Sequence, residues 1–244
     1  SACMAPDETP RADISSRAAF RPASGADLAP GVVLLHGFAG WPGVMWPLAR
    51  SLSHEGYRTF LPFYPSWRWP LDRIVGHLAV RVERFAAQVG GPVHFVGHSM
   101  GGLVARALIR QHRPAALSRV VMLGTPNAGS EIADMLTQYR ISRFILGQAE
   151  AALITRRDRR LIEMLGSVDY PVGIIAGSRP LIHTPISSSL PRPHDGKVSV
   201  AATHVEGEIA HVVLPLSHAV LPYHPSAQAQ VRAFLSSGAF DETP

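Results

Sequence analysis

The sequence feature that most constrains the fold is the pentapeptide Gly97-His98-Ser99-Met100-Gly101, which has the pattern Gly-x-Ser-x-Gly. A short apolar run at 92–96 precedes it, and residues 102–110 follow it with apolar side chains at helical spacing. A serine at such a strand-to-helix turn is strained and needs small neighbours, because the strand and the helix pass close together. The turn exposes the serine oxygen above a helix N-terminus, where negative charge is stabilised. We therefore predict that Ser99 is a nucleophile; the alternative is an ordinary glycine-rich turn.

Strand and helix patterns alternate along the rest of the chain. Amphipathic spacing predicts helices between the strands, and the one at 70–89 begins with proline. This alternation predicts an α/β fold with a mostly parallel twisted sheet and helices on both faces. Functional side chains should then gather at the carboxyl ends of the strands. Short apolar runs predict strands at 31–35, 57–61, 92–96, 119–123, 172–176 and 209–214, a short strand or turn at 197–200, and a last helix at 226–235.

The length of 244 residues fits a single domain, 1–244. Within it, 1–30 should be a partly extended N-terminal segment with an edge strand near 15–20. Residues 131–165 should be a helical insertion that acts as a lid or cap. Its apolar side chains precede the basic run Arg156–Arg160, so an amphipathic basic helix could approach a lipid interface. The alternative is a segment that covers the core and faces water. The apolar residues in question are Ile141, Phe144, Ile145 and Leu153.

Composition narrows the possible partners. The formal charge is +5 and Lys197 is the only lysine, but no basic region alternates with aromatic residues, so we expect no nucleic-acid partner. No apolar run approaches the ~20 residues that a membrane span needs. The single cysteine, Cys3, allows no intrachain disulfide and offers no metal cluster. We predict no metal ligand, no cofactor and no stable protein partner. The sequence shows no signal peptide and allows no disulfide, and the location stays open between cytoplasmic and secreted.

A serine hydroxyl needs a base to accept its proton, and the base needs an acid to orient it. Both should follow Ser99 in the chain, at strand ends. Among the later histidines we favour His218, since it comes directly after the last apolar strand, from which a loop can return to the serine. His224 is the alternative, although it precedes Pro225, where the last helix should begin.

The acid is less sharply defined than the histidine. We favour Asp195, which lies in a loop beside a glycine, after a strand and before His218. Glu206 and Glu208, near the last strand, are alternatives, and Asp195 could also be a simple Asp-Gly turn. Asp169 precedes a strand, so it should lie at the opposite edge of the sheet.

An acyl-transfer site also needs N–H donors for the developing oxyanion. One should be the backbone N–H of Met100, directly after the nucleophile, and the other the backbone N–H of Phe38, in the loop after the first strand. The rings of His36 and His98 should support their loops rather than transfer protons.

Four segments together resemble the α/β-hydrolase fold family and, within it, bacterial lipases and esterases of the triacylglycerol lipase type. The resemblance implies a triad of Ser99, Asp195 and His218 that cleaves carboxylic esters through an acyl-enzyme intermediate. Calcium occurs in some of those lipases, but nothing in this sequence identifies ligands for it. The matching segments are Val32–Phe38, Phe95–Arg106, Leu123–Ser130 and His194–Ser199.

The tryptophans point to a lipophilic substrate, a small-molecule ester. Trp41 follows the predicted oxyanion loop, and Trp67 and Trp69 follow the next strand, so we predict that these rings line an acyl pocket. Trp46 is interpreted as ordinary core packing. Two other functions remain open: an amidase, thioesterase or polyester depolymerase with the same triad, and a non-catalytic binding module on a hydrolase scaffold.

Overall fold

The computed structural model describes residues 29–128, 159–182 and 187–242 of the chain. Within these ranges six strands form one sheet in the order β2-β1-β3-β4-β5-β6, and every pair of neighbouring strands is parallel. The parallel sheet predicted from the sequence is therefore confirmed. The strands are β1 (Gly31–Leu35), β2 (Arg58–Phe60), β3 (Val93–His98), β4 (Leu117–Leu123), β5 (Val172–Gly177) and β6 (Ala210–Leu214).

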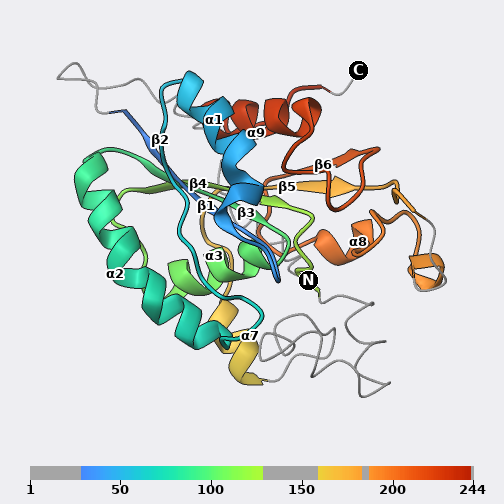
Figure 1. Ribbon diagram of the computed structural model, residues 1–244, viewed down its shortest axis with the longest axis horizontal. Coiled ribbons are helices and arrows are strands. Elements are labelled where there is room, and N and C mark those ends of the chain that lie inside the picture. The colour runs from blue at the N-terminus through green and yellow to red at the C-terminus, as the bar shows by residue number, and fades with distance from the viewer. Residues whose placement is uncertain (1–28, 129–158, 183–186, 243–244) are drawn as a thin grey trace, which may run out of the picture.

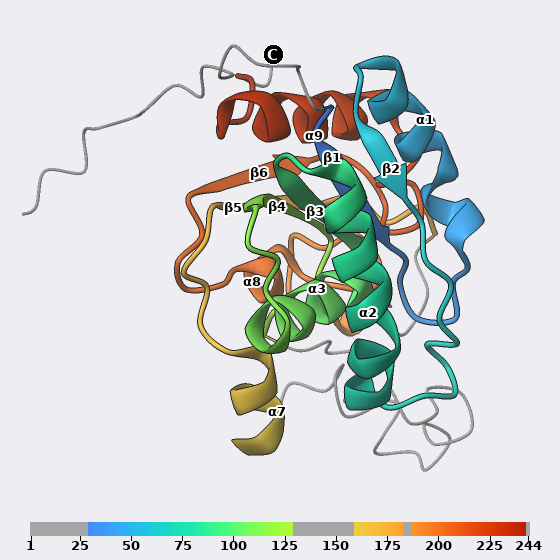
Figure 2. The ribbon, with the colours of Figure 1, turned by 90° about the vertical axis from the view of Figure 1, so that its left-hand side faces the viewer.

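Helices cover both faces of this sheet. Figure 1 shows α1 and α9 on one face and α2 and α3 on the other, and the view turned by 90° in Figure 2 shows the same two layers. This arrangement confirms the predicted fold class. The helical elements are η1 (Pro42–Met45), α1 (Trp46–His54), α2 (Leu71–Val89), α3 (Met100–Gln111), α7 (Arg159–Leu165), η3 (Ser187–Ser189), α8 (Val200–Thr203) and α9 (Pro225–Ser237).

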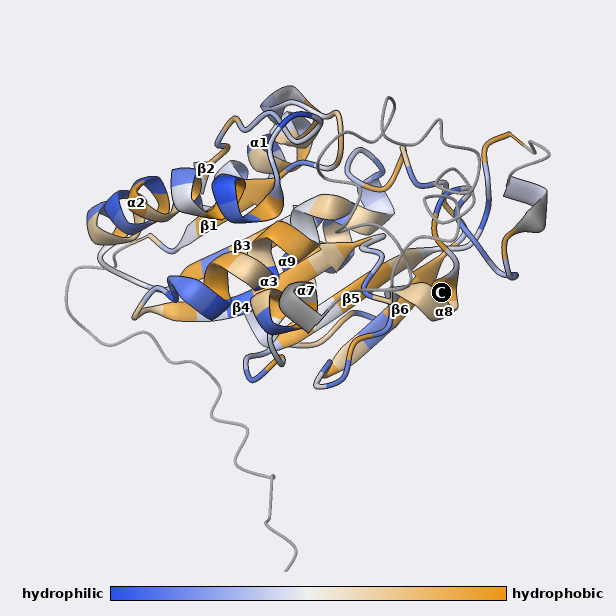
Figure 3. Cartoon of the chain, turned by 90° about the horizontal axis from the view of Figure 1, so that it is seen from below, coloured by the Kyte–Doolittle hydropathy of each residue, from blue (hydrophilic) through white to orange (hydrophobic). Residues whose placement is uncertain are grey.

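Each face of the sheet buries its own apolar core. Side chains alternate along a strand, so Val33 and Leu35 of β1 pack with α2 and α3, whereas Val32 and Leu34 pack with α1 and α9. A strand that is buried on both faces reads as a continuous apolar run, which is why β1 was recognisable in the sequence. In Figure 3 hydrophobic residues dominate the central strands and α3, while α2 also carries hydrophilic residues.

The longest helix, α2, shows how local sequence sets an element. Its apolar residues recur at helical spacing and are buried, among them Ile74 and Leu78. Each such side chain contributes about 1.5–3 kcal/mol through burial. Pro70 stands at the N-cap with extended backbone, and Gly90 ends the helix in the left-handed region at φ 64°. These signals agree with the predicted range 70–89.

The sheet order places two loops beside each other where function is expected. β1 lies between β2 and β3, and the helices that follow β1 and β3 pack on opposite faces. The connections therefore diverge at the carboxyl ends of these two strands, which is where ligands bind in open α/β sheets. Ser99 follows β3 and the segment 36–38 follows β1.

Two expectations differ from what the structure shows. Trp46 was interpreted as core packing, and this is wrong: its side chain is 55% exposed. Trp46 shares a helix face with Arg50, whose guanidinium carbon lies 5.6 Å from the centroid of the Trp46 ring, while Met45 and Leu48 turn inward.

The segment predicted as a short strand or turn at 197–200 makes an isolated bridge between His194 and Ser199 and then enters α8.

The predicted cap insertion at 131–165 is described only at its end, where α7 covers Arg159–Leu165. The rest of that insertion, with its four apolar residues, lies outside the described residues, as does the expected edge strand near 15–20. Among the described helices, none combines the length and the apolar character that crossing a membrane requires.

Candidate active site

Ser99 occupies a strained turn between β3 and α3. Its backbone has φ 55° and ψ −126°, in the positive-φ region that L-residues rarely adopt, which costs on the order of 1–3 kcal/mol. The turn requires glycine two residues before and two residues after Ser99. A Cβ at Gly101 would lie 2.2 Å from the Leu35 carbonyl oxygen, and one at Gly97 would lie 2.5 Å from the Gly102 amide nitrogen. The flanking glycines are therefore a steric requirement of this turn.

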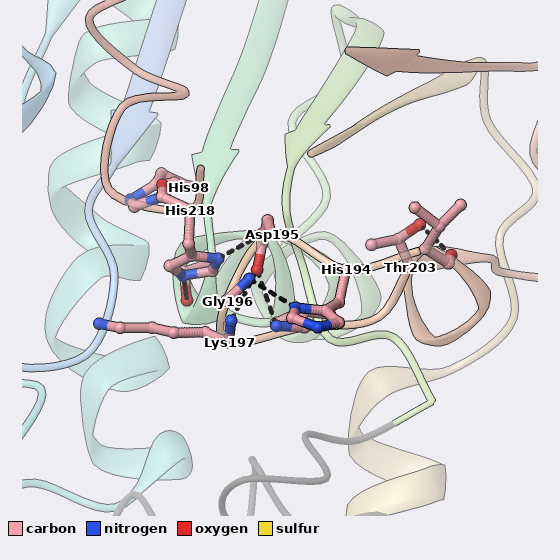
Figure 4. Close-up of polar contacts among 10 residues, drawn as sticks. His98, His194, Asp195, Gly196, Lys197, Thr203 and His218 are labelled. Atoms are coloured by element: carbon pink, nitrogen blue, oxygen red, sulfur yellow. Dashed lines mark hydrogen bonds and ion pairs between the residues drawn. The ribbon is translucent and has the colours of Figure 1, made fainter. Parts of the chain in front are cut away.

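His218 reaches Ser99 from the loop after β6. Its Nε2 lies 2.9 Å from the Ser99 Oγ, and its Nδ1 lies 2.7 Å from the Asp195 Oδ2. His218 and Asp195 are buried, at 4% and 2% exposure. The structure thus brings the three residues selected from the sequence into one hydrogen-bonded row, and Figure 4 shows His218 and Asp195 facing each other.

Asp195 is held by the backbone of its own turn. Its Oδ1 accepts hydrogen bonds from the N–H groups of Lys197, at 2.9 Å, and Val198, at 2.8 Å, which leaves Oδ2 for His218. The His218 N–H in turn donates to the Asp195 carbonyl oxygen at 3.0 Å. Gly196 lies between these residues at φ 101°. Both the carboxylate and the loop that carries the imidazole are therefore fixed by main-chain contacts (Figure 4).

Electrostatics keep this carboxylate ionised. Burial acts to raise the pKa of Asp195, but the charge of His218 and the hydrogen bonds from His218, Val198 and Lys197 outweigh it and hold the pKa below its usual value. An ionised Asp195 can orient the neutral imidazole and stabilise the imidazolium that forms when His218 accepts a proton.

His98 supports the histidine loop instead of meeting a substrate. Its Nε2–H donates to the carbonyl oxygen of His218 at 3.0 Å, and the two ring centroids lie 5.0 Å apart. Burial and the nearby charge of His218 lower the pKa of His98 to about 3. The ring is therefore neutral at neutral pH, and its single N–H is committed to positioning His218.

The loop after β1 lies against the serine. A Cβ at Gly37 would come 3.0 Å from the Ser99 Cβ, so glycine permits this approach. The carbonyl oxygen of Gly37 accepts from the Nδ1–H of His36 at 3.0 Å, from the Ser66 hydroxyl at 3.1 Å and from the Gly40 N–H at 3.2 Å. These three donors fix the orientation of the peptide that joins Gly37 to Phe38.

Fixing that peptide also fixes the Phe38 N–H, because in a planar trans peptide the N–H points opposite to the carbonyl. Met100 is the first residue of α3, where the helix itself offers no acceptor for the backbone N–H. The role of these two N–H groups as oxyanion donors stays a prediction.

Sequence reasoning missed two residues that build this loop, Tyr64 and Ser66. The Tyr64 hydroxyl donates to the His36 carbonyl oxygen at 2.5 Å, and its ring stacks on the His36 imidazole with centroids 4.0 Å apart. Both residues lie in the connection after β2 and are fully buried. Neither residue belongs to a sequence motif, so no local signal pointed to this supporting role.

The alternative triad members lie in other environments. His224 caps the N-terminus of α9, where its side chain accepts a hydrogen bond from the Ser226 N–H. Asp169 forms an exposed ion pair with Arg113 at 3.0 Å. Glu208 contacts His204 at 2.6 Å. Glu206 has no place in the hydrogen-bonded row described above.

The tryptophans differ in their surroundings. Trp41 is 65% exposed and Trp67 is 44% exposed, with the Trp67 ring edge-on to Phe63. Trp69 is partly buried against the core, and the guanidinium carbon of Arg73 lies 4.4 Å from the centroid of its ring. A role for Trp41, Trp67 or Trp69 in an acyl pocket stays a prediction.

The sequence profile described as the alpha/beta hydrolase family matches residues 32–193, which is more than half of the chain. This chain belongs to the alpha/beta hydrolase family. The matched range begins in β1 and contains both Ser99 and the loop at 36–38.

Individual relatives of this alpha/beta hydrolase match shorter stretches. A Gibberella zeae protein described as an AB hydrolase superfamily protein is 36% identical over 124 residues, covering 46% of this chain and 42% of that protein. A triacylglycerol lipase of Pseudarthrobacter phenanthrenivorans is 32% identical over 115 residues, covering 43% of this chain and 35% of the lipase. The matches thus span less than half the length of these relatives.

Among solved structures, the crystal structure of a Bacillus licheniformis lipase in its mature form is similar to this alpha/beta hydrolase. The TM-score is 0.67 at 20% sequence identity, with 88% of this chain and 94% of that chain covered. At this identity the likeness concerns the fold.

Proposed function

We propose that this alpha/beta hydrolase cleaves carboxylic esters through an acyl-enzyme, with Ser99 as nucleophile, His218 as general base and acid, and Asp195 as the orienting carboxylate. The observation that carries the proposal is the row of two hydrogen bonds, 2.9 Å from Ser99 Oγ to His218 Nε2 and 2.7 Å from His218 Nδ1 to Asp195 Oδ2. A hydroxyl, an imidazole and a buried carboxylate in this order are the parts that serine-based acyl transfer requires.

The reaction follows from this row. Ser99 Oγ attacks the ester carbonyl carbon while His218 Nε2 accepts its proton, and the tetrahedral intermediate collapses when the imidazolium protonates the departing alcohol oxygen. Water then attacks the acyl-enzyme, again giving a proton to His218, which returns it to Ser99 as the carboxylic acid leaves. Asp195 stays ionised throughout, consistent with its lowered pKa.

The oxyanion of each tetrahedral intermediate would be bound by the backbone N–H groups of Phe38 and Met100. The support is the position of Gly37 against Ser99 and the three hydrogen bonds that fix the Gly37 carbonyl. Donors of this kind act without reorganising when charge develops, and loss of one costs about 2.7–4 kcal/mol of transition-state stabilisation.

The loops near Ser99 favour a substrate with a lipophilic acyl group. The loops at 36–43 and 61–70 carry exposed aromatic rings, among them Trp41, Phe63 and Trp67. The lipase named among the relatives acts on triacylglycerols according to its description. We take lipophilic esters as the substrate class and treat amides, thioesters and polyesters as the competing classes.

The test is a panel of p-nitrophenyl esters from acetyl to palmitoyl, run beside a matched thioester and a matched anilide. We expect turnover of the esters with the highest kcat/KM on an acyl chain longer than acetyl. A fluorophosphonate probe should label the protein once, on Ser99. Faster turnover of the thioester or anilide would replace the ester assignment, and absence of both turnover and labelling would leave a binding module as the better description.

Trp67 and Trp46 provide a matched pair for the acyl pocket. Both rings are about half exposed, but Trp67 lies in the loop after β2 beside Phe63, whereas Trp46 lies on α1 with Arg50. We expect Trp67→Ala to change the ratio of kcat/KM for long and short esters by about 10-fold, a typical effect of altering an apolar pocket. Trp46→Ala should leave that ratio unchanged. Equal ratios in both variants would remove Trp67 from the pocket.

A further inference from the structure

Three potential ligand side chains meet in the segment that links α8 to β6. One ligand atom from each of His204, Glu208 and His211 can be chosen so that all three lie within 4.8 Å of one another. In the sequence they form the pattern His-x3-Glu-x2-His, of which only Glu208 entered the expectations about the triad, as an alternative acid. The cluster is separate from the row formed by Ser99 and its partners, and its role is independent of the proposed ester hydrolysis.

The carboxylate of this cluster is oriented by the backbone. Glu208 Oε2 accepts from the Val205 N–H at 2.9 Å, and the Glu208 N–H donates back to the Val205 carbonyl at 3.1 Å. The other oxygen, Oε1, lies 2.6 Å from His204 Nδ1. Glu208 Oε2 is therefore fixed by the backbone. Glu208 Oε1 is directed at the cluster, where it can accept a hydrogen bond or coordinate a cation.

The hydrogen bonds of Thr203 define the tautomer of His211. The Thr203 hydroxyl donates its single proton to the Val200 carbonyl oxygen at 2.7 Å, so at its 2.9 Å contact with His211 Nε2 it must accept. His211 Nε2 then carries the proton, and the lone pair of neutral His211 is on Nδ1. A hydroxyl or carbonyl that fixes the non-coordinating nitrogen of a histidine is the usual support of a metal ligand.

The two imidazoles of the cluster lie face to face. The rings of His204 and His211 stack with centroids 4.0 Å apart and an interplanar angle of 16°. The lone pair of an imidazole nitrogen lies in the plane of its ring, so an ion would sit at the shared edge of the two rings, beside the Glu208 carboxylate.

We propose that His204, Glu208 and His211 bind a divalent transition-metal ion of the zinc class. Two imidazole nitrogens and one carboxylate oxygen are donors that zinc prefers, with bonds of about 2.0–2.2 Å, whereas calcium and magnesium prefer oxygen donors alone. Three protein ligands leave a fourth position for water. Tetrahedral bonds of that length place donors about 3.3 Å apart. The exposed His204 side chain can rotate to meet this spacing while Thr203 holds His211.

Such an ion would stabilise the segment that follows the turn carrying Asp195. The N-cap of α8 is Ser199, four residues after Asp195, and the Thr203 carbonyl at the end of the helix accepts from the Asn127 Nδ2 at 2.7 Å. The site would therefore tie the start of β6 to α8. Since the ion binds the folded chain at a site that the unfolded chain lacks, we expect it to raise the melting temperature.

The experiment uses the whole chain without a polyhistidine tag, stripped of metal with a chelator. Cobalt(II) is added as a spectroscopic probe of coordination, and zinc, calcium and magnesium are compared in thermal melts and in titration calorimetry. We expect one equivalent of Co²⁺ to give visible absorption of a four-coordinate ion with nitrogen and oxygen ligands. Zinc should displace Co²⁺ and raise the melting temperature, whereas calcium and magnesium should do neither.

Variants locate the site. His204→Ala and Glu208→Gln should weaken zinc binding by at least about 10-fold, and Thr203→Val should weaken it by about 10-fold through the loss of the support to His211. His112→Ala, which removes another exposed histidine, should bind as the wild type does. Melts in chelator show whether each variant is folded. Absence of zinc binding in the wild type, equal binding in His204→Ala and wild type, or a preference for calcium would each overturn the proposal.

Discussion

Ser99→Ala is expected to lower kcat for ester hydrolysis by about 10⁴–10⁶, the effect of removing the nucleophile of a serine triad. The physical reason is that His218 Nε2, 2.9 Å from the Ser99 Oγ, would have no hydroxyl to deprotonate and no acyl-enzyme could form. Turnover of a p-nitrophenyl ester and labelling by a fluorophosphonate, followed by intact mass, measure the two consequences together. Labelling should disappear along with turnover.

This variant should lose activity without losing the fold. The alanine methyl group occupies the same space as the Ser99 Cβ, so Gly37 can keep its close approach and the backbone around the turn can stay in place. We therefore expect a folded protein whose melting temperature stays within about 1 °C of the wild-type value. In a chain of this size such a shift corresponds to a few tenths of a kcal/mol of stability. Ser236→Ala, which removes an exposed hydroxyl on α9, is the matched control and should keep full activity. Near-normal turnover by Ser99→Ala would refute the assignment of the nucleophile.

The turn that carries Ser99 and the loop after β1 could be predicted from sequence because local residues determine their structure. Gly97 and Gly101 are required by close backbone approaches within and beside the turn, and an apolar run of five residues suffices to mark β1. Chain order then pointed to His218, since few histidines follow a buried strand at its carboxyl end.

Other features were out of reach because they depend on contacts between distant segments. No local pattern shows that Tyr64 and Ser66 would hold the carbonyls of His36 and Gly37. Trp46 was interpreted as core packing, but helix periodicity decides burial: Met45 and Leu48 share the inward face, and Trp46 does not. Residue type alone was therefore a weaker guide than residue spacing.

Asp195→Asn is expected to lower kcat by about 10⁴ while leaving the fold intact, the size of effect known when a triad carboxylate becomes an amide. The reason lies in the backbone of the acid turn. The N–H groups of Lys197 and Val198 both donate to the position of Oδ1, so the amide oxygen of an asparagine must occupy it. Its NH₂ group then faces His218 Nδ1 as a donor.

That reversal changes the tautomer of the imidazole. His218 Nδ1 would accept from the asparagine, so the neutral ring would carry its proton on Nε2 and present a donor, rather than a lone pair, to the Ser99 hydroxyl. Deprotonation of Ser99 would fail although each side chain kept its position. kcat, the rate of fluorophosphonate labelling and the melting temperature should be measured side by side.

Asp169→Asn serves as the matched control, because that carboxylate is paired with Arg113 on the surface and should affect turnover little. A large loss in Asp169→Asn, or a small one in Asp195→Asn, would contradict the role of Asp195. A large loss of kcat with slow labelling and an unchanged melting temperature would separate a tautomer effect from a collapse of the turn. The backbone contacts of Asp195 thus do more than position a charge: they decide which nitrogen of His218 is free to accept a proton.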